Sequence, residues 1–191
     1  EEDTHYWRIS QYLLPFYTMI GPYGKDPSRS FHAWIPIDDE NTLVFGATYH
    51  PNRPFTEEEL DSFEARGGVY SVGRKVGYLN PDPLVPWSQW RPRQNLMNDF
   101  WVDFDAAKKD RWCPIPHLFA QDSGMSETMG PIYDRTQEHL GAADKAIIST
   151  RRLLQRAVEA VADGADPLGV APTYYQLRAR DDVVPDGTDW H

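Results

Sequence analysis

The sequence predicts an α+β domain in which an antiparallel β-sheet comes first and a long C-terminal helix packs across it. Two observations support this fold class. Residues 6–49 contain three apolar, aromatic-rich stretches separated by turn-forming residues, which is typical of strands. Residues 142–162 instead repeat apolar side chains at helical spacing. The chain has 191 residues, enough for one domain with a sizeable core.

The first stretch, YWRISQYLLPFYTMI at residues 6–20, has no polar face at helical spacing and is predicted as strand. Pro15 within it indicates an edge, a bend or a bulge. The next two stretches are FHAWIPI at 31–37 and TLVFGATY at 42–49, and they flank the polar residues DDEN at 38–41. A four-residue polar loop between two such stretches predicts a β-hairpin.

A short helix is predicted to follow the hairpin over residues 55–67. Thr56 and Glu59 are spaced as a capping box, and Phe55 and Leu60 as a hydrophobic staple. Gly67 is suited to end this helix.

The segment from 67 to 95 is predicted to be irregular, and loops of this length in compact domains are usually functional or form a lid. The long helix of residues 142–162 then ends at Gly164, and residues 164–191 are expected to form an extended C-terminal tail. One stripe of this helix is apolar: Ile147, Leu154, Val158 and Val161.

Composition limits the partners of the chain. Its formal net charge of −10 makes nucleic acid an unsuitable partner, because binding to the phosphate backbone needs a basic surface. Cys113 is the single cysteine, so no intrachain disulfide forms, which fits a reducing cytoplasm. No apolar run approaches the ~18 residues of a membrane span. Seven Trp, ten Tyr and eight Phe supply material for a pocket that holds a flat apolar ligand.

The segment AQDSGMSETMGPIYDRTQEHLG, residues 120–141, concentrates groups that bind metals or handle protons. If its first part is helical, Asp122, Met125, Ser126 and Met129 share one face, so a carboxylate is expected to be buried beside two soft apolar side chains. An isolated buried carboxylate is costly and is normally paired or metal-bound. Two interpretations stay open at this point. Asp122 is either a hard oxygen ligand at a pocket wall or a helix N-terminal acid stabilised by the dipole.

Gly130 and Pro131 are predicted to stop that helix. The polar residues that follow are interpreted as an ion-paired structural network that fixes the turn before the long helix, rather than as a catalytic site: Asp134, Arg135, Glu138 and His139.

This segment, followed by DKAIISTRRLL, resembles the C-terminal part of Rieske non-haem iron oxygenase large subunits. The similarity is to the phthalate-dioxygenase-like group, which includes related aromatic O-demethylases. The stretches QYLLPFYTMI and NDFWVDFDAAKKDRW resemble the same group. The resemblance covers most of residues 6–162 and is most specific through 97–156. Residues 1–163 are therefore interpreted as a partial oxygenase catalytic domain.

The resemblance implies a helix-grip-like antiparallel sheet wrapped on the long C-terminal helix. It also implies a mononuclear Fe(II) held by two histidines and one carboxylate, with electrons from a Rieske [2Fe–2S] cluster of the neighbouring subunit in a trimer. The resemblance implies that the electrons come ultimately from NAD(P)H through a reductase or ferredoxin. The family's carboxylate ligand matches Asp122, which favours the ligand interpretation. Met125 and Met129 then belong to the substrate pocket.

The chain also departs from the family pattern. The Rieske motif needs two cysteines, and the paired iron-binding histidines follow a D-x-x-H-x-x-x-x-H pattern that this sequence lacks. Both elements precede the catalytic sheet in the family. We therefore expect residues 1–191 to be the C-terminal part of a longer oxygenase, inactive as an isolated fragment.

The expected substrate is an aromatic carboxylate, either phthalate-like or a methoxylated aromatic acid, and dihydroxylation and O-demethylation stay open. An anionic substrate calls for an arginine. Arg8 is the candidate by position, on a strand face with Tyr12, although a solvent-facing role suits it equally. Arg91 and Arg93 beside Trp90 are further options. The alternative function is a metal-free helix-grip binding module for an apolar aromatic ligand.

Overall fold

The computed structural model describes residues 3–22, 26, 28–66, 72 and 76–189. They form two compact units. We call them unit 1, which comprises Glu1–Ile37, Thr42–Pro51 and Asp134–His191, and unit 2, which comprises Asp38–Asn41 and Asn52–Tyr133.

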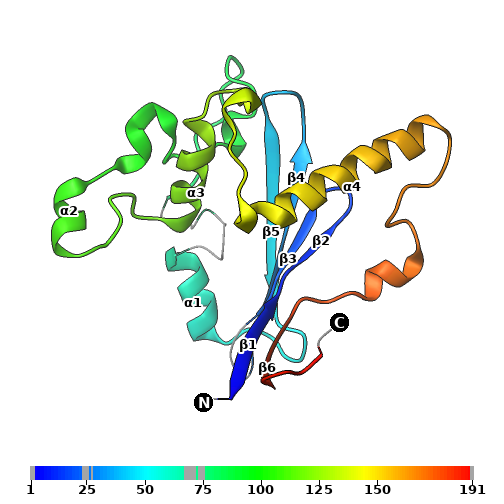
Figure 1. The fold of residues 1–191 in the computed structure, drawn as a ribbon. Coiled ribbons are helices and arrows are strands. Elements are labelled where there is room, and N and C mark those ends of the chain that lie inside the picture. The colour runs from blue at the N-terminus through cyan, green and yellow to red at the C-terminus, as the bar shows by residue number, and fades with distance from the viewer. Residues whose placement is uncertain (1–2, 23–25, 27, 67–71, 73–75, 190–191) are drawn as a thin grey trace. The chain divides into compact units, whose positions relative to one another are not determined.

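Unit 1 contains two antiparallel sheets (Figure 1). One has four strands in chain order: β2 (Gln11–Leu13), β3 (Tyr17–Ile20), β4 (Arg29–Pro36) and β5 (Thr42–Tyr49). The other pairs β1 (Thr4–Ile9) with β6 (Arg180–Pro185). Antiparallel strands combined with the helices described below agree with the predicted α+β class.

The expectation of one strand over residues 6–20 is wrong in detail, because the chain forms β1, β2 and β3 there. The break between β2 and β3 is a turn that contains Pro15. Proline has no N–H to donate to a sheet, so a continuous strand through this position would lose a ladder hydrogen bond. The Tyr12 hydroxyl donates to the Pro15 carbonyl at 2.5 Å across the turn.

The predicted hairpin is confirmed. β4 and β5 pair from Pro36 opposite Thr42 to Arg29 opposite Tyr49. The connecting loop is closed by Asp38, whose Oδ1 accepts from the backbone N–H groups of Glu40 at 2.9 Å and Asn41 at 2.7 Å. Local side-chain bonding of this kind is why Asp and Asn favour turns.

Residues 164–191 contain two elements that the sequence analysis did not predict. They are the 3₁₀ turn η5 (Pro172–Gln176) and strand β6. Strand β6 runs antiparallel to β1, with Thr4 opposite Pro185 and Ile9 opposite Arg180. The two ends of the described chain therefore meet in one sheet (Figure 1).

The predicted long helix is confirmed as α4 (Lys145–Ala162), and it follows the short turns η3 (Arg135–Gln137) and η4 (Ala142–Asp144). Gly164 takes a left-handed φ of 75°, which suits a glycine just past a helix end. No side chain of α4 is buried, and Ile147 and Val158 on its apolar stripe are exposed. Packing of this helix across the sheet, and the helix-grip arrangement, stay predictions.

Unit 2 consists of short helices and turns around a small core. The elements are α1 (Glu57–Arg66), η1 (Ser88–Trp90), η2 (Leu96–Trp101), α2 (Phe104–Lys109) and α3 (Leu118–Glu127). The buried core cluster comprises Val76, Phe100, Phe119 and Ala120, with Val72 and Ile115 packed against it.

The capping box of α1 is confirmed. The Glu59 N–H donates to Thr56 Oγ1 at 3.2 Å, and the Thr56 N–H donates to Glu59 Oε2 at 2.8 Å. The ring that packs on Phe55 is Phe63, at a centroid distance of 5.0 Å, whereas Leu60 is exposed. The predicted stop at Gly67 lies outside the described residues.

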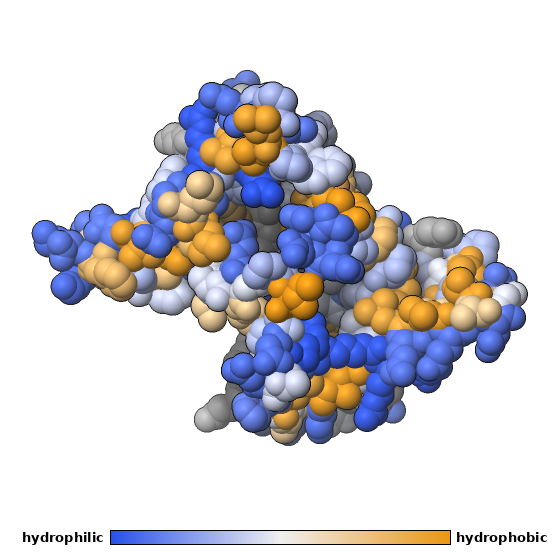
Figure 2. Space-filling model, turned by 90° about the horizontal axis from the view of Figure 1, so that it is seen from above, coloured by the Kyte–Doolittle hydropathy of each residue, from blue (hydrophilic) through white to orange (hydrophobic). Residues whose placement is uncertain are grey.

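Large hydrophobic side chains are exposed in both units, and Figure 2 shows them reaching the surface in several places. They include Phe45 in unit 1 and Trp112 in unit 2. Extensive exposed apolar surface marks places where further protein or a ligand binds. Within the described part of the chain, no helix is both long and apolar enough to span a membrane.

Candidate functional site

Helix α3 carries Asp122, and its two faces differ sharply. Phe119, Ala120 and Gly124 are buried toward the core of unit 2. The prediction that Asp122 is buried is wrong, because the core takes the opposite face and leaves this residue exposed. Among the described residues the Asp122 carboxylate has no hydrogen bond or ion pair, and its backbone carbonyl accepts from Ser126 Oγ at 3.2 Å.

Apolar side chains flank Asp122 on the exposed face. Leu118 is 52% exposed, Met125 74% and Met129 51%. Their spacing from Asp122 places them along one side of the helix, although Met129 lies past its last residue, Glu127. The predicted shared face therefore holds for Asp122 and Met125, but as surface, whereas Met129 lies beyond the helix. We call Leu118, Asp122, Met125 and Met129 the acid stripe.

Glu127, at the end of α3, is also an exposed residue, although its carboxyl is partly desolvated. Burial raises the pKa of its carboxyl above the ordinary value, and the positive charge of Arg91 opposes this rise. Arg91 therefore lies near an acid of its own unit. The Nε of Arg93 donates to the Tyr78 carbonyl at 2.9 Å, which fixes the loop that contains the Tyr78–Pro92 bridge.

Two residues that the sequence analysis did not single out adjoin the start of α3. The Gln94 side chain is buried, and its Oε1 lies 2.8 Å from His117 Nδ1. His117 is the N-cap residue of α3. Burial, followed by the positive charge of Arg111, lowers the pKa of His117 below its ordinary value. No local sequence signal links Gln94 to His117, because 23 positions separate them.

Arg8 and Tyr12 lie in unit 1, in separate sheets. Arg8 Nε donates to the Gly21 carbonyl at 2.6 Å, and Gly21 N–H donates to Ser10 Oγ at 3.2 Å, so Arg8 and Ser10 both bind Gly21. The Tyr12 hydroxyl is bonded to Pro15, and burial raises its pKa. Their role toward a substrate stays a prediction.

The ion-paired network before α4 is confirmed in part. Glu138 accepts from Arg135 at 3.2 Å, as expected, and also from both terminal nitrogens of Arg151 at 2.5 and 2.7 Å. Arg151 was not part of the prediction, and His139 has no place in the network among the described residues. Asp134 instead caps η3 by accepting from the Thr136 N–H at 3.0 Å.

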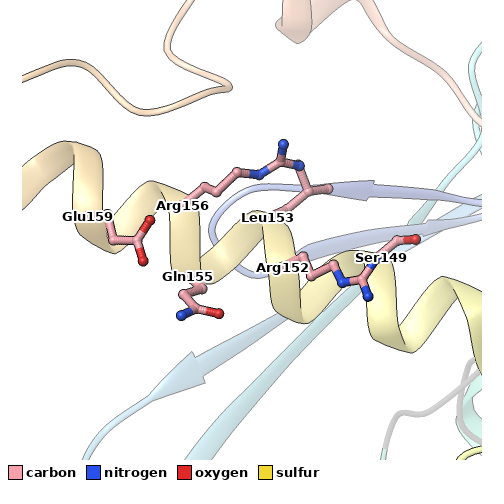
Figure 3. Close-up of a pocket in the computed structure, with 6 residues that line it drawn as sticks. All are labelled: Ser149, Arg152, Leu153, Gln155, Arg156 and Glu159. Carbon is pink, nitrogen blue, oxygen red and sulfur yellow. The ribbon is translucent and has the colours of Figure 1, made fainter.

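Two of the surface hollows formed by the described residues do not include the acid stripe. Figure 3 shows the first hollow, which lies on α4. Because every labelled side chain comes from this single helix, the hollow is an open surface. Its lining residues are Ser149, Arg152, Leu153, Gln155, Arg156 and Glu159. The other, of about 160 Å³, lies in unit 1 beside Phe31, with Arg29 and Arg178 at its wall. Among the residues that the structure describes, no three His, Cys, Asp or Glu side chains gather as a metal-binding group.

The amino-acid sequence is similar to one protein family and to two known oxygenase subunits. Residues 1–191 match the family described as LigXa C-terminal domain like. The chain is 32% identical over 196 residues to the oxygenase subunit of 3-chlorobenzoate-3,4-dioxygenase from Comamonas testosteroni, an alignment of 100% of this chain and 44% of that protein. It is 30% identical over 167 residues to the oxygenase subunit of phthalate 4,5-dioxygenase from Pseudomonas putida, covering 87% of this chain and 34% of that protein.

The chain thus spans less than half the length of these two relatives. Both are oxygenase subunits of aromatic-carboxylate dioxygenases by name, which agrees with the resemblance found in the sequence. Because the family match covers the whole chain, this protein belongs to the LigXa C-terminal domain-like family.

Proposed function

We propose that the chain is the C-terminal part of the oxygenase component of an aromatic ring-hydroxylating dioxygenase or O-demethylase. The substrate would be an aromatic carboxylate, phthalate-like or methoxylated, and Asp122 would be the carboxylate ligand of a mononuclear Fe(II). One observation carries the proposal: an exposed carboxylate, without a partner among the described residues, lies within an apolar stripe. The relatives' names supply the class of reaction.

The donor chemistry of the acid stripe fits an iron ligand. A carboxylate oxygen is a common ligand of non-haem Fe(II) in a set of two histidines and one carboxylate. The stripe supplies one such oxygen, and the two histidines would come from a segment outside residues 1–191. When bound, the iron supplies the activation of dioxygen beside the substrate.

The remaining residues of the stripe would bind the ring. Leu118, Met125 and Met129 offer apolar and polarisable contacts to an aromatic face and would exclude water from the site once they are covered. A substrate carboxylate would need a cation, and Arg8 is the candidate that we propose, with Tyr12 as a further substrate contact. Arg8 Nε donates to the Gly21 carbonyl at 2.6 Å.

The other parts of the proposed enzyme lie outside the chain. They are a Rieske [2Fe–2S] domain, the paired-histidine segment, and a reductase or ferredoxin that delivers electrons from NAD(P)H. We propose a cytoplasmic homotrimer, or a multiple of it, in which a neighbouring subunit contributes the cluster. The exposed hydrophobic side chains of both units are compatible with burial in such an assembly.

The test is Asp122→Ala in the complete oxygenase subunit. We expect loss of mononuclear iron, measured by metal analysis, and loss of turnover, while the visible spectrum of the Rieske cluster is kept. The matched control is Asp105→Ala, which removes an exposed helical acid of the same unit that pairs with Lys108 at 3.6 Å. Wild-type iron content in Asp122→Ala would refute the ligand assignment. Stoichiometric binding of an aromatic acid by iron-free wild-type protein, with no turnover after iron is added, would instead favour the metal-free binding module.

A further inference from the structure

Gln94 is a buried polar residue whose side chain forms hydrogen bonds to two partners close to the helix that carries Asp122. Its side chain is 1% exposed. The Nε2 donates to the Phe100 carbonyl at 2.6 Å, and the Oε1 faces His117 Nδ1 at 2.8 Å. Because the amide nitrogen must face the carbonyl, the amide oxygen accepts, and His117 carries its proton on Nδ1. Both ends of this buried amide are therefore satisfied.

One partner of Gln94 belongs to a strained turn that supports α3. Asp99, Phe100 and Trp101 have successive left-handed φ values of 50°, 51° and 54°. Non-glycine residues in this region cost about 1–3 kcal/mol each unless the surroundings hold them. The turn buries the Phe100 ring in the core cluster with Phe119 and Ala120, on the side of α3 opposite Asp122.

The other partner begins α3 itself. The His117 carbonyl accepts from the N–H groups of Ala120 at 3.0 Å and Gln121 at 3.1 Å, which are the first hydrogen bonds of the helix. The His117 ring stacks on Phe119, with centroids 6.1 Å apart, and meets Trp101 edge-on at 6.4 Å. The direction of the first helical turn therefore depends on where the His117 ring is held.

We propose that Gln94 and His117 are positioning residues for Asp122: their hydrogen bond ties the start of α3 to the strained turn beneath it and so sets where the carboxylate points. This inference rests on the proposed role of Asp122 as an iron ligand. Residues that hydrogen-bond a metal ligand directly typically change metal affinity about 10–100-fold when they are replaced, and we expect the low end of that range for residues that position the ligand's helix. Neither side chain touches the metal.

The charge state of His117 agrees with this arrangement. Burial and Arg111 lower its pKa, so the ring is neutral near pH 7. A neutral ring protonated on Nδ1 donates one hydrogen bond to Gln94 without placing a charge beside the core.

The experiment uses the complete oxygenase subunit and paired variants of each residue. His117→Phe keeps an aromatic ring but removes the donor, whereas His117→Asn places an amide nitrogen close to the position of Nδ1. Gln94→Leu removes both hydrogen bonds at similar volume. The control, Gln137→Leu, removes a glutamine that bonds an exposed carboxylate, that of Asp134, at 3.0 Å.

Two readouts are measured. The first is the rate at which mononuclear iron is lost to a chelator, and the second is amide hydrogen exchange of residues 118–122 in iron-free protein. We expect His117→Phe and Gln94→Leu to lose iron about tenfold faster and to exchange faster in this turn. His117→Asn and Gln137→Leu should stay near wild type. Amide exchange in the rest of unit 2 reports folding of this part of the chain, and if Gln94→Leu does not fold, the two His117 variants decide.

The outcomes separate this inference from the proposed function. If Asp122→Ala loses iron but His117→Phe retains it at the wild-type rate, the positioning role is overturned and the ligand assignment stands. If His117→Asn behaves like His117→Phe, the hydrogen bond is not the cause and the proposal is overturned. If Asp122→Ala keeps its iron, both proposals fall together.

Discussion

Adding a methyl group at Gly124 should stabilise the helix that carries Asp122. A Cβ at this position would lie 3.5 and 3.6 Å from two ring carbons of Phe100 and 3.6 Å from Ile115 Cδ1, which are ordinary van der Waals distances. Glycine in a helix interior is about 1 kcal/mol less favourable than alanine. Gly124→Ala should therefore stabilise α3 by about 1 kcal/mol, because it restores helix propensity without displacing the core.

The matched control is Gly21→Ala, the same change in a position without room. There a Cβ would approach Arg8 Cγ to 2.8 Å and two backbone carbonyl oxygens, of Ile9 and Arg180, to 3.1 Å. Backbone atoms of two paired strands cannot move aside cheaply, so we expect a loss of about 1–3 kcal/mol.

Amide hydrogen exchange measures both effects locally, since exchange reports the free energy of opening of each segment. Gly124→Ala should slow exchange of the α3 amides about fivefold, the factor that corresponds to ~1 kcal/mol. Gly21→Ala should accelerate exchange in β1 and β6. Faster exchange in α3 of Gly124→Ala would refute the packing argument, as would unchanged exchange in β1 and β6 of Gly21→Ala.

Two further predictions concern ionised carboxylates. The hydrogen bonds from Arg53, the largest cause, and from the Thr56 N–H hold the pKa of Glu59 at about 2, below its ordinary 4.5. Because the pKa of Glu59 is lower in the folded protein, its stabilisation of α1 is complete above about pH 4.5 and is lost as the pH falls toward 2. Glu59→Gln should therefore remove this part of the acid dependence of amide exchange in α1. Glu138→Gln should loosen the first turns of α4 by depriving Arg151 of its bidentate partner. The measurement is amide exchange at residues 145–151, which should be faster in Glu138→Gln than in the control Arg152→Met. Equal exchange in these two variants would contradict the prediction.

The sequence predicts best those elements whose hydrogen bonds are local. Asp38 closes its own hairpin loop over two and three residues. Thr56 and Glu59 satisfy each other within one helical turn. In each case the residues that specify the element are also the residues that stabilise it, so pattern alone is sufficient.

The elements that pattern missed depend on distant partners. Strand β6 forms because β1 offers an edge, and His5 Nε2 at one end meets Asp186 Oδ1 at 2.8 Å although 181 positions separate them. The Gln94–His117 bond is a second case. Nothing within a short window of either segment signals such a contact, because only the folded chain brings the partners together.

Helix α3 shows why periodicity located a shared face but misjudged its burial. Both faces of this helix are apolar in part, and helical spacing alone does not tell which one meets the core. Phe119, Ala120 and Gly124 are buried because the Phe100 ring and Ile115 pack beside them. That choice leaves the acid stripe on the surface, where its apolar side chains are unfavourable in water while the Asp122 carboxylate costs nothing. In the proposed enzyme another segment and the iron would cover the stripe, so the apolar side chains would be buried away from water and the Asp122 carboxylate would act as a ligand. A helix with this composition is therefore suited to complete a site rather than to form one alone.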